Sequence, residues 1–305
     1  MNENEIAEYE KLPEEKGKET QARIIIRDKD THEEISSFII ELVSPNHYHP
    51  IEIHQCGVYA ARSFGYDYKN RRPQPNYSAE IARYYFDGSV ESIAELGTSI
   101  NGVYNKVFQN DFRIDPEELF VVLVKGFGGE AGYALVFRNL DSKSDAYSAT
   151  FSELKNRFTF IDGEFDFYDW ARDGKYFWGN FSIGADVSAI FRINKLNWTL
   201  EIFRAPIGTK GGDILNMEKG YITYYDGSPW TGDADLDKQL EDKWIKEGRQ
   251  IHFYIYDLFN QKSIRLATIK DPAWQFRAKW LSDTELEYYV PPEPGTRRVY
   301  TILSN

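Results

Sequence analysis

The sequence is poor in the features that mark disulfide-rich, zinc-caged or membrane-spanning proteins. Cys56 is the one cysteine among 305 residues, which excludes an intrachain disulfide and a zinc cage built from cysteines. The longest apolar run, Leu119–Val124, has six residues, whereas a helix that spans a bilayer needs about 20. We therefore expect no membrane insertion.

Positive charge is also scarce. The chain carries 36 Lys and Arg against 48 Asp and Glu, which gives a formal net charge of -12 and a pI near 5.0. Such a field repels the phosphates of nucleic acids and of anionic lipids. We therefore expect no nucleic-acid partner, and no sequence motif points to a cofactor.

Apolar residues are few in the first 20 positions, where seven residues are Glu. A segment with so little to bury cannot offset the entropy lost on ordering. We predict a disordered acidic tail over residues 1–20 and one folded domain over residues 21–305. No basic start followed by an apolar stretch is present, so the tail is not a signal peptide. The chain is either cytoplasmic or an exported domain without its leader.

Helical periodicity is nearly absent as well. From Arg23 onward the chain consists of short runs rich in Tyr, Phe, Trp, Ile and Val, separated by turns, which is typical of β-strands. The exception is Asp233–Lys246, where Leu236, Leu240 and Trp244 recur every four residues and form one apolar stripe. We predict one short helical insertion in an all-β framework.

What the sequence does contain is a repeat. A strand, a short turn and a second strand recur five times, and the first strand of each pair ends at Asp28, Asp87, Asp141, Asn194 or Asp257. The spacings are 59, 54, 53 and 63 residues, and a second type of hairpin lies between the pairs. Two alternating hairpins make a four-stranded antiparallel sheet of about 55 residues. A repeat of this size built only from strands predicts a β-propeller.

The turn of the second hairpin carries a recurring motif. It reads Phe112-Arg-Ile-Asp-Pro-Glu-Glu-Leu-Phe, Tyr168-Asp-Trp-Ala-Arg-Asp-Gly-Lys-Tyr-Phe and Ala278-Lys-Trp-Leu-Ser-Asp-Thr-Glu-Leu-Glu-Tyr. This motif resembles the W-S-P-D-G-K-x-aliphatic turn of TolB-like (WD40-like, PD40) propellers, in which the aromatic residue packs between blades while Asp and Gly form the turn. The resemblance implies a fold and not a chemistry, because the family includes interaction scaffolds as well as the propeller caps of oligopeptidases. We expect Phe112, Trp170 and Trp280 to be buried between blades.

Four complete blades are predicted. They span Pro50–Glu95, Asp111–Phe151, Phe165–Ala205 and Asp213–Ile269. The C-terminal strands (residues 275–303) and the N-terminal strands (residues 22–40) then complete one more blade, so that the two ends of the chain close the ring. This arrangement gives five blades. Because one strand is left over, six blades are the alternative.

Catalytic motifs are missing, but carboxylates leave one enzymatic alternative. An oligopeptidase would need a Gly-x-Ser-x-Gly elbow, which the sequence does not contain. Some propellers are glycosidases that use two carboxylates roughly 5–10 Å apart, and Asp115, Asp166 and Asp169 lie where inner strands could present them to a central channel. The competing interpretation is that Asp side chains at turns bind their own backbone. A carboxylate-based glycoside hydrolase or lyase is therefore the alternative function.

A histidine cluster raises the question of a metal. His47, His49 and His54 form a His-x-His-x4-His pattern, and three imidazoles can bind zinc or copper when the loop folds back. No fourth ligand or supporting partner is identifiable. We interpret the segment as a polar loop and predict no metal.

Two long connections are the predicted contact surface. Residues 66–78 and residues 228–248 exceed the roughly 2–6 residues that usually connect strands. They offer Arg71, Arg72 and Trp230, residue types that dominate binding energy at interfaces. We therefore favour a non-enzymatic propeller platform that binds a protein, peptide or small ligand through its loop face. The sequence gives neither the partner nor the oligomeric state.

Overall fold

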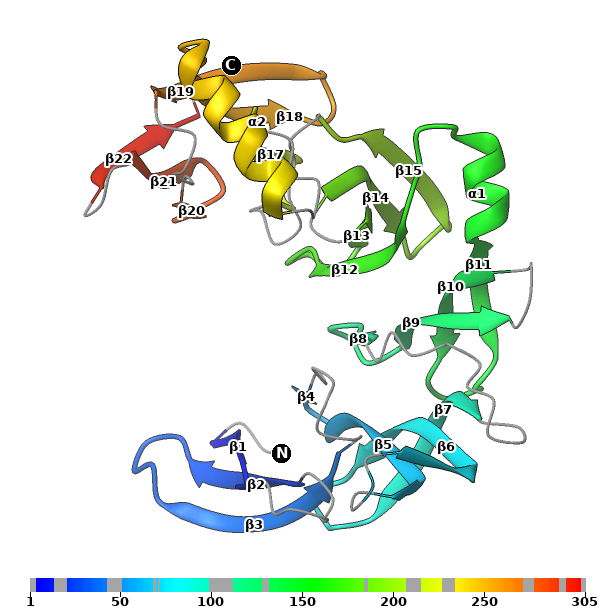
Figure 1. The fold of residues 1–305 in the computed structure, drawn as a ribbon. Helices are drawn as coiled ribbons and strands as arrows, with labels where there is room; N and C mark the ends of the chain where they lie inside the picture. Colours follow the sequence, from blue (N-terminus) through cyan, green and yellow to red (C-terminus); the bar gives the residue numbers. More distant parts are fainter. Residues whose placement is uncertain are drawn as a thin grey trace. The chain divides into compact units, whose positions relative to one another are not determined.

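A computed structural model of the chain describes 22 strands and two helices (Figure 1). The residues that it describes are 4–13, 21–42, 51–67, 70, 72–98, 112–127, 132–183, 186–206, 215–226, 234–270, 277–290 and 295–302. The chain divides into two compact units, Met1–Arg157 and Phe158–Asn305.

The first unit contains three antiparallel sheets, each with its strands in chain order. Their strands are β1 (Glu5–Lys11), β2 (Gln21–Asp28) and β3 (Glu34–Glu41); β4 (Ile51–Ile53), β5 (Val58–Asp67), β6 (Arg72–Tyr84) and β7 (Val90–Thr98); β8 (Phe112–Ile114), β9 (Phe120–Phe127), β10 (Gly132–Asn139) and β11 (Asp145–Thr150). Helix α1 (Phe151–Arg157) follows β11.

The second unit has the same kind of architecture. Its strands are β12 (Glu164–Trp170), β13 (Tyr176–Ile183), β14 (Asp186–Asn194) and β15 (Thr199–Arg204); β16 (Leu215–Asn216), β17 (Tyr221–Tyr225), β18 (Ile251–Asp257) and β19 (Lys262–Ile269); β20 (Arg277–Trp280), β21 (Glu285–Val290) and β22 (Thr296–Thr301). Helix α2 (Ala234–Lys246) lies between β17 and β18. Neither described helix is long and apolar enough to cross a membrane.

These sheets confirm the all-β propeller fold predicted from the repeat. The four predicted blades are the four-stranded sheets β4–β7, β8–β11, β12–β15 and β16–β19. Among the described residues, the sheets at the two ends of the chain, β1–β3 and β20–β22, have three strands each. Closure of the ring by the chain ends and the number of blades stay predictions. The predicted helical insertion is confirmed as α2.

The acidic N-terminal segment differs from its prediction. Residues 5–11 form β1, which pairs with β2 along its whole length. Its carboxylates meet cations on β2, since Arg27 Nε lies 3.3 Å from Glu8 and Arg23 Nη1 lies 3.5 Å from Glu10. The prediction of a disordered tail is therefore wrong for these residues. A neighbouring strand supplies the backbone partners that apolar content alone could not reveal.

The turns that follow β2, β6, β10, β14 and β18 are each held by an Asp or Asn side chain at the start of the turn. Asp257 Oδ1 accepts the backbone N–H groups of Phe259 and Asn260, both at 2.9 Å. Asp28, Asp87, Asn139 and Asn194 accept backbone N–H groups in the same way. Four residues after the cap the backbone is left-handed at His32, Lys143, Trp198 and Gln261. In the third repeat the capping residue is Asn139, two positions before the Asp141 named from the sequence.

The core is aromatic and lies between sheets. Phe112 is fully buried in one cluster with Tyr59, from the sheet before it. Trp170 is 6% exposed, and its ring centroid lies 5.3 Å from that of Phe177. Trp280 is half-buried and packs against the cluster that joins β16–β19 to β20–β22. Burial between sheets is confirmed for Phe112. Trp170 is buried against a ring of its own sheet, and the burial of Trp280 is only partial.

Two connections differ from the sequence interpretation. Residues 66–78 are not a 13-residue loop, because β5 and β6 continue their pairing as far as Asp67 opposite Arg72. Helix α1 was not predicted, although its first turn carries a capping box. There Thr150 Oγ1 accepts the Glu153 N–H at 3.3 Å, and Glu153 Oε2 accepts the Thr150 N–H at 3.4 Å.

Candidate functional site

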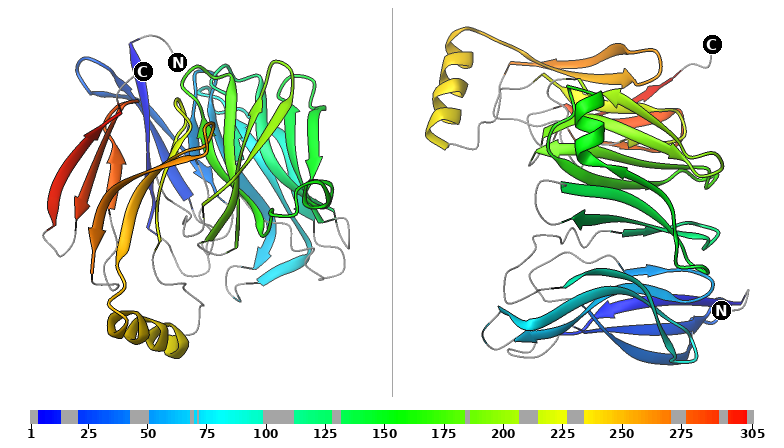
Figure 2. Two further views of the ribbon diagram at one scale, coloured as in Figure 1. Left: turned by 90° about the horizontal axis from the view of Figure 1, so that it is seen from above. Right: turned by 90° about the vertical axis from the view of Figure 1, so that its right-hand side faces the viewer.

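The antiparallel order gives every four-stranded sheet two different ends. The first and third turns lie at one end and the second connection lies at the other, because successive strands run in opposite directions. We call the end with the first and third turns the short-turn end. Helix α2 belongs to the second connection of its sheet and therefore lies at the opposite end (Figure 2).

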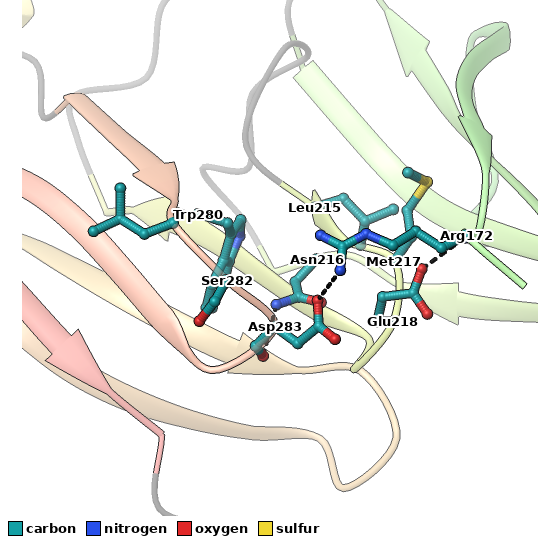
Figure 3. Close-up of a pocket in the computed structure, with 9 residues that line it drawn as sticks. Arg172, Leu215, Asn216, Met217, Glu218, Trp280, Ser282 and Asp283 are labelled. Atoms are coloured by element: carbon teal, nitrogen blue, oxygen red, sulfur yellow. Dashed lines mark hydrogen bonds and ion pairs between the residues drawn. The ribbon is translucent and has the colours of Figure 1, made fainter.

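A pocket of about 150 Å³ lies at the short-turn end of the second unit. Three sheets contribute to it through their first turns, β12–β13, β16–β17 and β20–β21, and through the strand ends beside them (Figure 3). The lining residues are Arg172, Leu215, Asn216, Met217, Glu218, Trp280, Leu281, Ser282 and Asp283.

Two carboxylates connect the β12–β13 turn to its neighbours. Glu218 Oε1 accepts the backbone N–H of Arg172 at 2.7 Å. The Arg172 guanidinium turns toward Asp283, with Nη1 3.1 Å from Oδ1 (Figure 3). The Arg172 side chain is 76% exposed and that of Asp283 is 41% exposed. Because both ions are in contact with water, this pair stabilises the fold by only a small amount.

A buried amide fixes the wall between the other two turns. Asn216 is 5% exposed, and its Nδ2 donates to the carbonyl oxygen of Asp283 at 3.0 Å. Its Oδ1 accepts the backbone N–H of Lys219 at 3.1 Å. On the neighbouring turn, Ser282 Oγ accepts the N–H of Glu285 at 3.1 Å. The turns around the pocket are therefore held in place before any ligand arrives.

The apolar part of the pocket is an indole with aliphatic neighbours. The Trp280 ring stacks on Tyr221 with centroids 6.4 Å apart and an interplanar angle of 29°. Leu215, Met217 and Leu281 also line the pocket. An indole held beside carboxylates suits a cation with an apolar stem.

The corresponding turns of the first unit are joined by a glutamate that binds two donors. Glu118 lies on the β8–β9 turn, and its Oε2 accepts the backbone N–H of Cys56 at 2.9 Å. Its Oε1 accepts the O–H of Tyr59, also at 2.9 Å. Burial, followed by the charge of Glu118, raises the pKa of Tyr59, and burial also raises the pKa of the Cys56 thiol. Both side chains therefore stay protonated at neutral pH.

The predicted histidine cluster is only partly described. His54 Nε2 lies 3.2 Å from Glu52 Oε2, and the same oxygen accepts the backbone N–H of Ile114 at 2.8 Å. His47 and His49 lie outside the described residues. Within the described part of the chain, no group of three or more His, Cys, Asp or Glu is placed to hold a metal ion.

The three carboxylates of the enzymatic alternative bind backbone groups. Asp115 is fully buried, and its Oδ2 accepts the N–H of Leu119 at 3.2 Å. Asp166 and Asp169 are exposed, and each accepts the N–H of the residue that follows it, at 2.9 and 2.7 Å. The Asp115 contact agrees with the competing interpretation, that Asp side chains at turns bind their own backbone, whereas Asp166 and Asp169 bind backbone groups within strand β12. A catalytic role for them stays a prediction.

Of the three predicted contact residues the structure describes only Arg72, which does not line the pocket. Arg71 and Trp230 lie outside the described residues, and Arg72 lies at the start of β6, opposite Asp67. On α2, Trp244 packs against the core cluster, and the Arg249 guanidinium lies 5.1 Å from the centroid of its ring. The side chain of Trp244 is therefore used for packing.

Of the residues that line the pocket, only Trp280 was singled out from the sequence, although the motif covers two of the three turns. Arg172 and Asp283 both belong to the recurring turn motif, which was interpreted as a marker of the fold. The sequence did contain one signal for a site, namely that the charged residues of these turns differ from one repeat to the next. The repeat places residues 172, 218 and 283 in equivalent turns of successive sheets, but it does not show which of their side chains meet.

Comparison with known proteins gives matches to solved structures alone. No family model and no curated protein matches the chain.

Among the solved structures, the β-propeller domain of the trilobed protease from Pyrococcus furiosus matches 100% of this chain and 79% of its own, with 12% identity and a TM-score of 0.45. TolB from Acinetobacter baumannii matches 97% of this chain and 65% of its own, with 13% identity and a TM-score of 0.36. Pyrococcus horikoshii acylaminoacyl peptidase matches 99% of this chain, which spans 45% of that protein, with 12% identity and a TM-score of 0.45. All three matches have sequence identities of 13% or less and TM-scores below 0.5, and no activity follows from them.

Proposed function

The chain is an all-β propeller, and we propose that it is a non-enzymatic platform that binds a protein or peptide partner. The pocket at the short-turn end of the second unit is the proposed binding site. Within the second unit, helix α2, which belongs to one of the two long connections that the sequence favoured, follows the other end of its sheet.

One observation carries the proposal. Turns from three different sheets, far apart in the sequence, converge on one pocket, and hydrogen bonds from Glu218 and Asn216 hold them in place. A preformed site loses little entropy when a ligand binds. Its volume of about 150 Å³ is below the roughly 300–1,000 Å³ of pockets for whole small molecules, so a single side chain of a larger partner suits it better.

The contacts around the pocket favour binding over catalysis. A hydrolase needs carboxylates that can give and take a proton at the reacting group. Here Glu218 accepts a backbone N–H and Asp283 is paired with a guanidinium. The glycoside hydrolase alternative has no comparable observation in its favour.

The test is to select peptides and map where they bind. A library of random peptides is panned against the full chain, and selected peptides are crosslinked to chains that carry a photoreactive phenylalanine analogue at position 281 or 196. Leu281 lines the pocket, whereas Leu196 lies on the β14–β15 turn of the same end and is more exposed, at 71% against 45%. We expect crosslinks from position 281 and few from position 196. Equal crosslinking from both positions, or no selected peptide, would contradict the proposal.

A further inference from the structure

We propose that this pocket accepts a cationic side chain, the lysine or arginine of a basic peptide segment, and that the bound cation replaces Arg172 beside Asp283. This inference rests on the proposed function, since it names the chemistry of the ligand at the same site. Four observations support it.

The first is the charge balance of the pocket. Glu218 and Asp283 are acidic and Arg172 is basic, so the lining carries two formal negative charges against one positive charge. Once Arg172 moves away, both carboxylates face an incoming cation. An anionic ligand would be repelled by both carboxylates, and the one guanidinium that could attract it, that of Arg172, is already paired with Asp283.

The second is that the Arg172–Asp283 pair is easily exchanged. Arg172 is held in the fold through its backbone N–H, which donates to Glu218. Its guanidinium is largely in water and can turn away without unfolding the β12–β13 turn. Asp283, by contrast, is fixed through its carbonyl oxygen by Asn216. The site thus has a stationary acceptor and a movable internal cation.

The third is the shape of the apolar wall. A lysine or arginine side chain needs an apolar surface for its stem and an anionic group for its head. Trp280, stacked on Tyr221, and Leu281 and Leu215 supply the first, and Asp283 supplies the second. The indole also attracts a cation through its π-electrons.

The fourth is the field of the whole chain. The net charge of -12 attracts basic segments from a distance and raises their local concentration. The pocket then distinguishes a basic side chain from the rest of the segment. Binding is therefore expected to weaken as salt is added.

The experiment uses short peptides as defined probes. Acetylated and amidated peptides of five residues carry one central lysine, arginine, glutamine or norleucine between glycines and serines. They are titrated into the full chain while the indole N–H resonance of Trp280 is followed by NMR. We expect the lysine and arginine peptides to shift this resonance, and the glutamine and norleucine peptides to leave it unchanged.

Charge-neutralising variants test the position of the cation. We expect Asp283→Asn to weaken the lysine peptide about five- to tenfold, because a charge-assisted contact is lost. Arg172→Gln removes the internal competitor and should tighten binding about two- to fivefold. Asp173→Asn is the matched control for Asp283→Asn, since it changes the charge by the same amount, and Asp173, which follows Arg172 in the β12–β13 turn, does not line the pocket. The control should leave the affinity within about twofold of the wild type.

The outcomes separate this inference from the proposed function. If selected peptides crosslink at position 281 but contain no lysine or arginine, the platform stands and the cation site is wrong. If Asp173→Asn weakens binding as much as Asp283→Asn, the attraction is general and the pocket is not selective, which also overturns the inference. Weaker binding to Arg172→Gln would show that Arg172 holds the ligand and would reverse the proposed exchange.

Discussion

The same junction, between the first turns of neighbouring sheets, is built in two ways in this protein. In the first unit, Glu118 binds both the Cys56 N–H and the Tyr59 O–H, so both of its oxygens are used within the protein. In the second unit, Glu218 binds the Arg172 N–H through one oxygen, and the next turn adds an exposed ion pair and a pocket.

The difference shows how a repeat fold acquires a site. The backbone framework is shared, since a glutamate from one turn accepts an N–H from the turn before it in both units. The side chains decide whether the junction is filled or leaves a pocket. Tyr59 fills and completes the first junction, whereas the turns around Glu218 leave room beside Trp280. On the proposed function, a few side-chain differences at the turns create a binding site on sheets whose backbone is alike.

The largest effect is expected from removing a buried side chain beside the junction of the second unit. Trp170 precedes the β12–β13 turn and is 6% exposed, so Trp170→Ala leaves a cavity behind Arg172. We expect the free energy of unfolding to fall by about 3–5 kcal/mol. Urea denaturation followed by near-UV circular dichroism measures it, and a stability equal to the wild type would contradict the assigned packing.

The next prediction compares two glycines with positive φ, one with a side chain close to the position of a Cβ and one without. Gly220 has φ +67°, and a Cβ there would lie 2.5 Å from the Phe259 ring, which covers the Arg192 guanidinium at 4.5 Å. We expect Gly220→Ala to cost about 2–3 kcal/mol. In the first unit Gly88 has φ +87° with nothing within 4 Å of such a Cβ, so Gly88→Ala should cost about 1 kcal/mol. Thermal melts of both variants measure the difference, and equal losses would show that Phe259 does not constrain the turn.

A smaller effect sharpens the comparison of the two glutamates. Glu118→Ala leaves the Tyr59 O–H and the Cys56 N–H without their acceptor, and Tyr59 is fully buried. We expect a loss of about 1–3 kcal/mol for this variant and less than about 1 kcal/mol for Glu218→Ala, whose donor sits on an exposed residue. Urea denaturation of both variants is the measurement. A larger loss for Glu218→Ala would reverse the account of which junction is closed.

The smallest effect concerns pH. Arg297, and after it Lys279, hold the pKa of Glu287 below its ordinary value of 4.5. A carboxyl whose pKa falls on folding stabilises the protein above its unfolded pKa, and this contribution is lost as the pH falls through the folded pKa. We expect Glu287→Gln to be less stable than the wild type at neutral pH and to lose less stability below pH 4.5. Parallel pH dependences for the two proteins would contradict this assignment.

The sequence predicted the framework because the framework is local. Asp257 can bind the N–H groups two and three residues later whatever surrounds it, so a recurring Asp or Asn marks the turn directly. The capping box of Thr150 and Glu153 was just as local and was overlooked. Composition misjudged β1, because its stability comes from pairing with β2 and not from its own apolar residues.

The pocket could not be predicted from the sequence. Arg172 and Asp283 form their ion pair although they lie 111 positions apart in the sequence. Both belong to the recurring turn motif, two repeats apart, but the motif does not show which side chains of the two turns meet. Loop length pointed to residues 66–78, where the chain in fact continues a hairpin. Long connections were expected to carry the contacts, whereas the pocket lies among the shortest turns.

The most direct test compares the two junction glutamates in one binding measurement. The affinity of the lysine-centred peptide is measured by NMR titration for Glu218→Gln and for Glu118→Gln, with thermal melts to confirm that both variants are folded. The account predicts that Glu218→Gln weakens binding about fivefold and that Glu118→Gln leaves it unchanged, because only Glu218 lines the pocket. Equal affinities for the two variants, or weaker binding to Glu118→Gln, would contradict it.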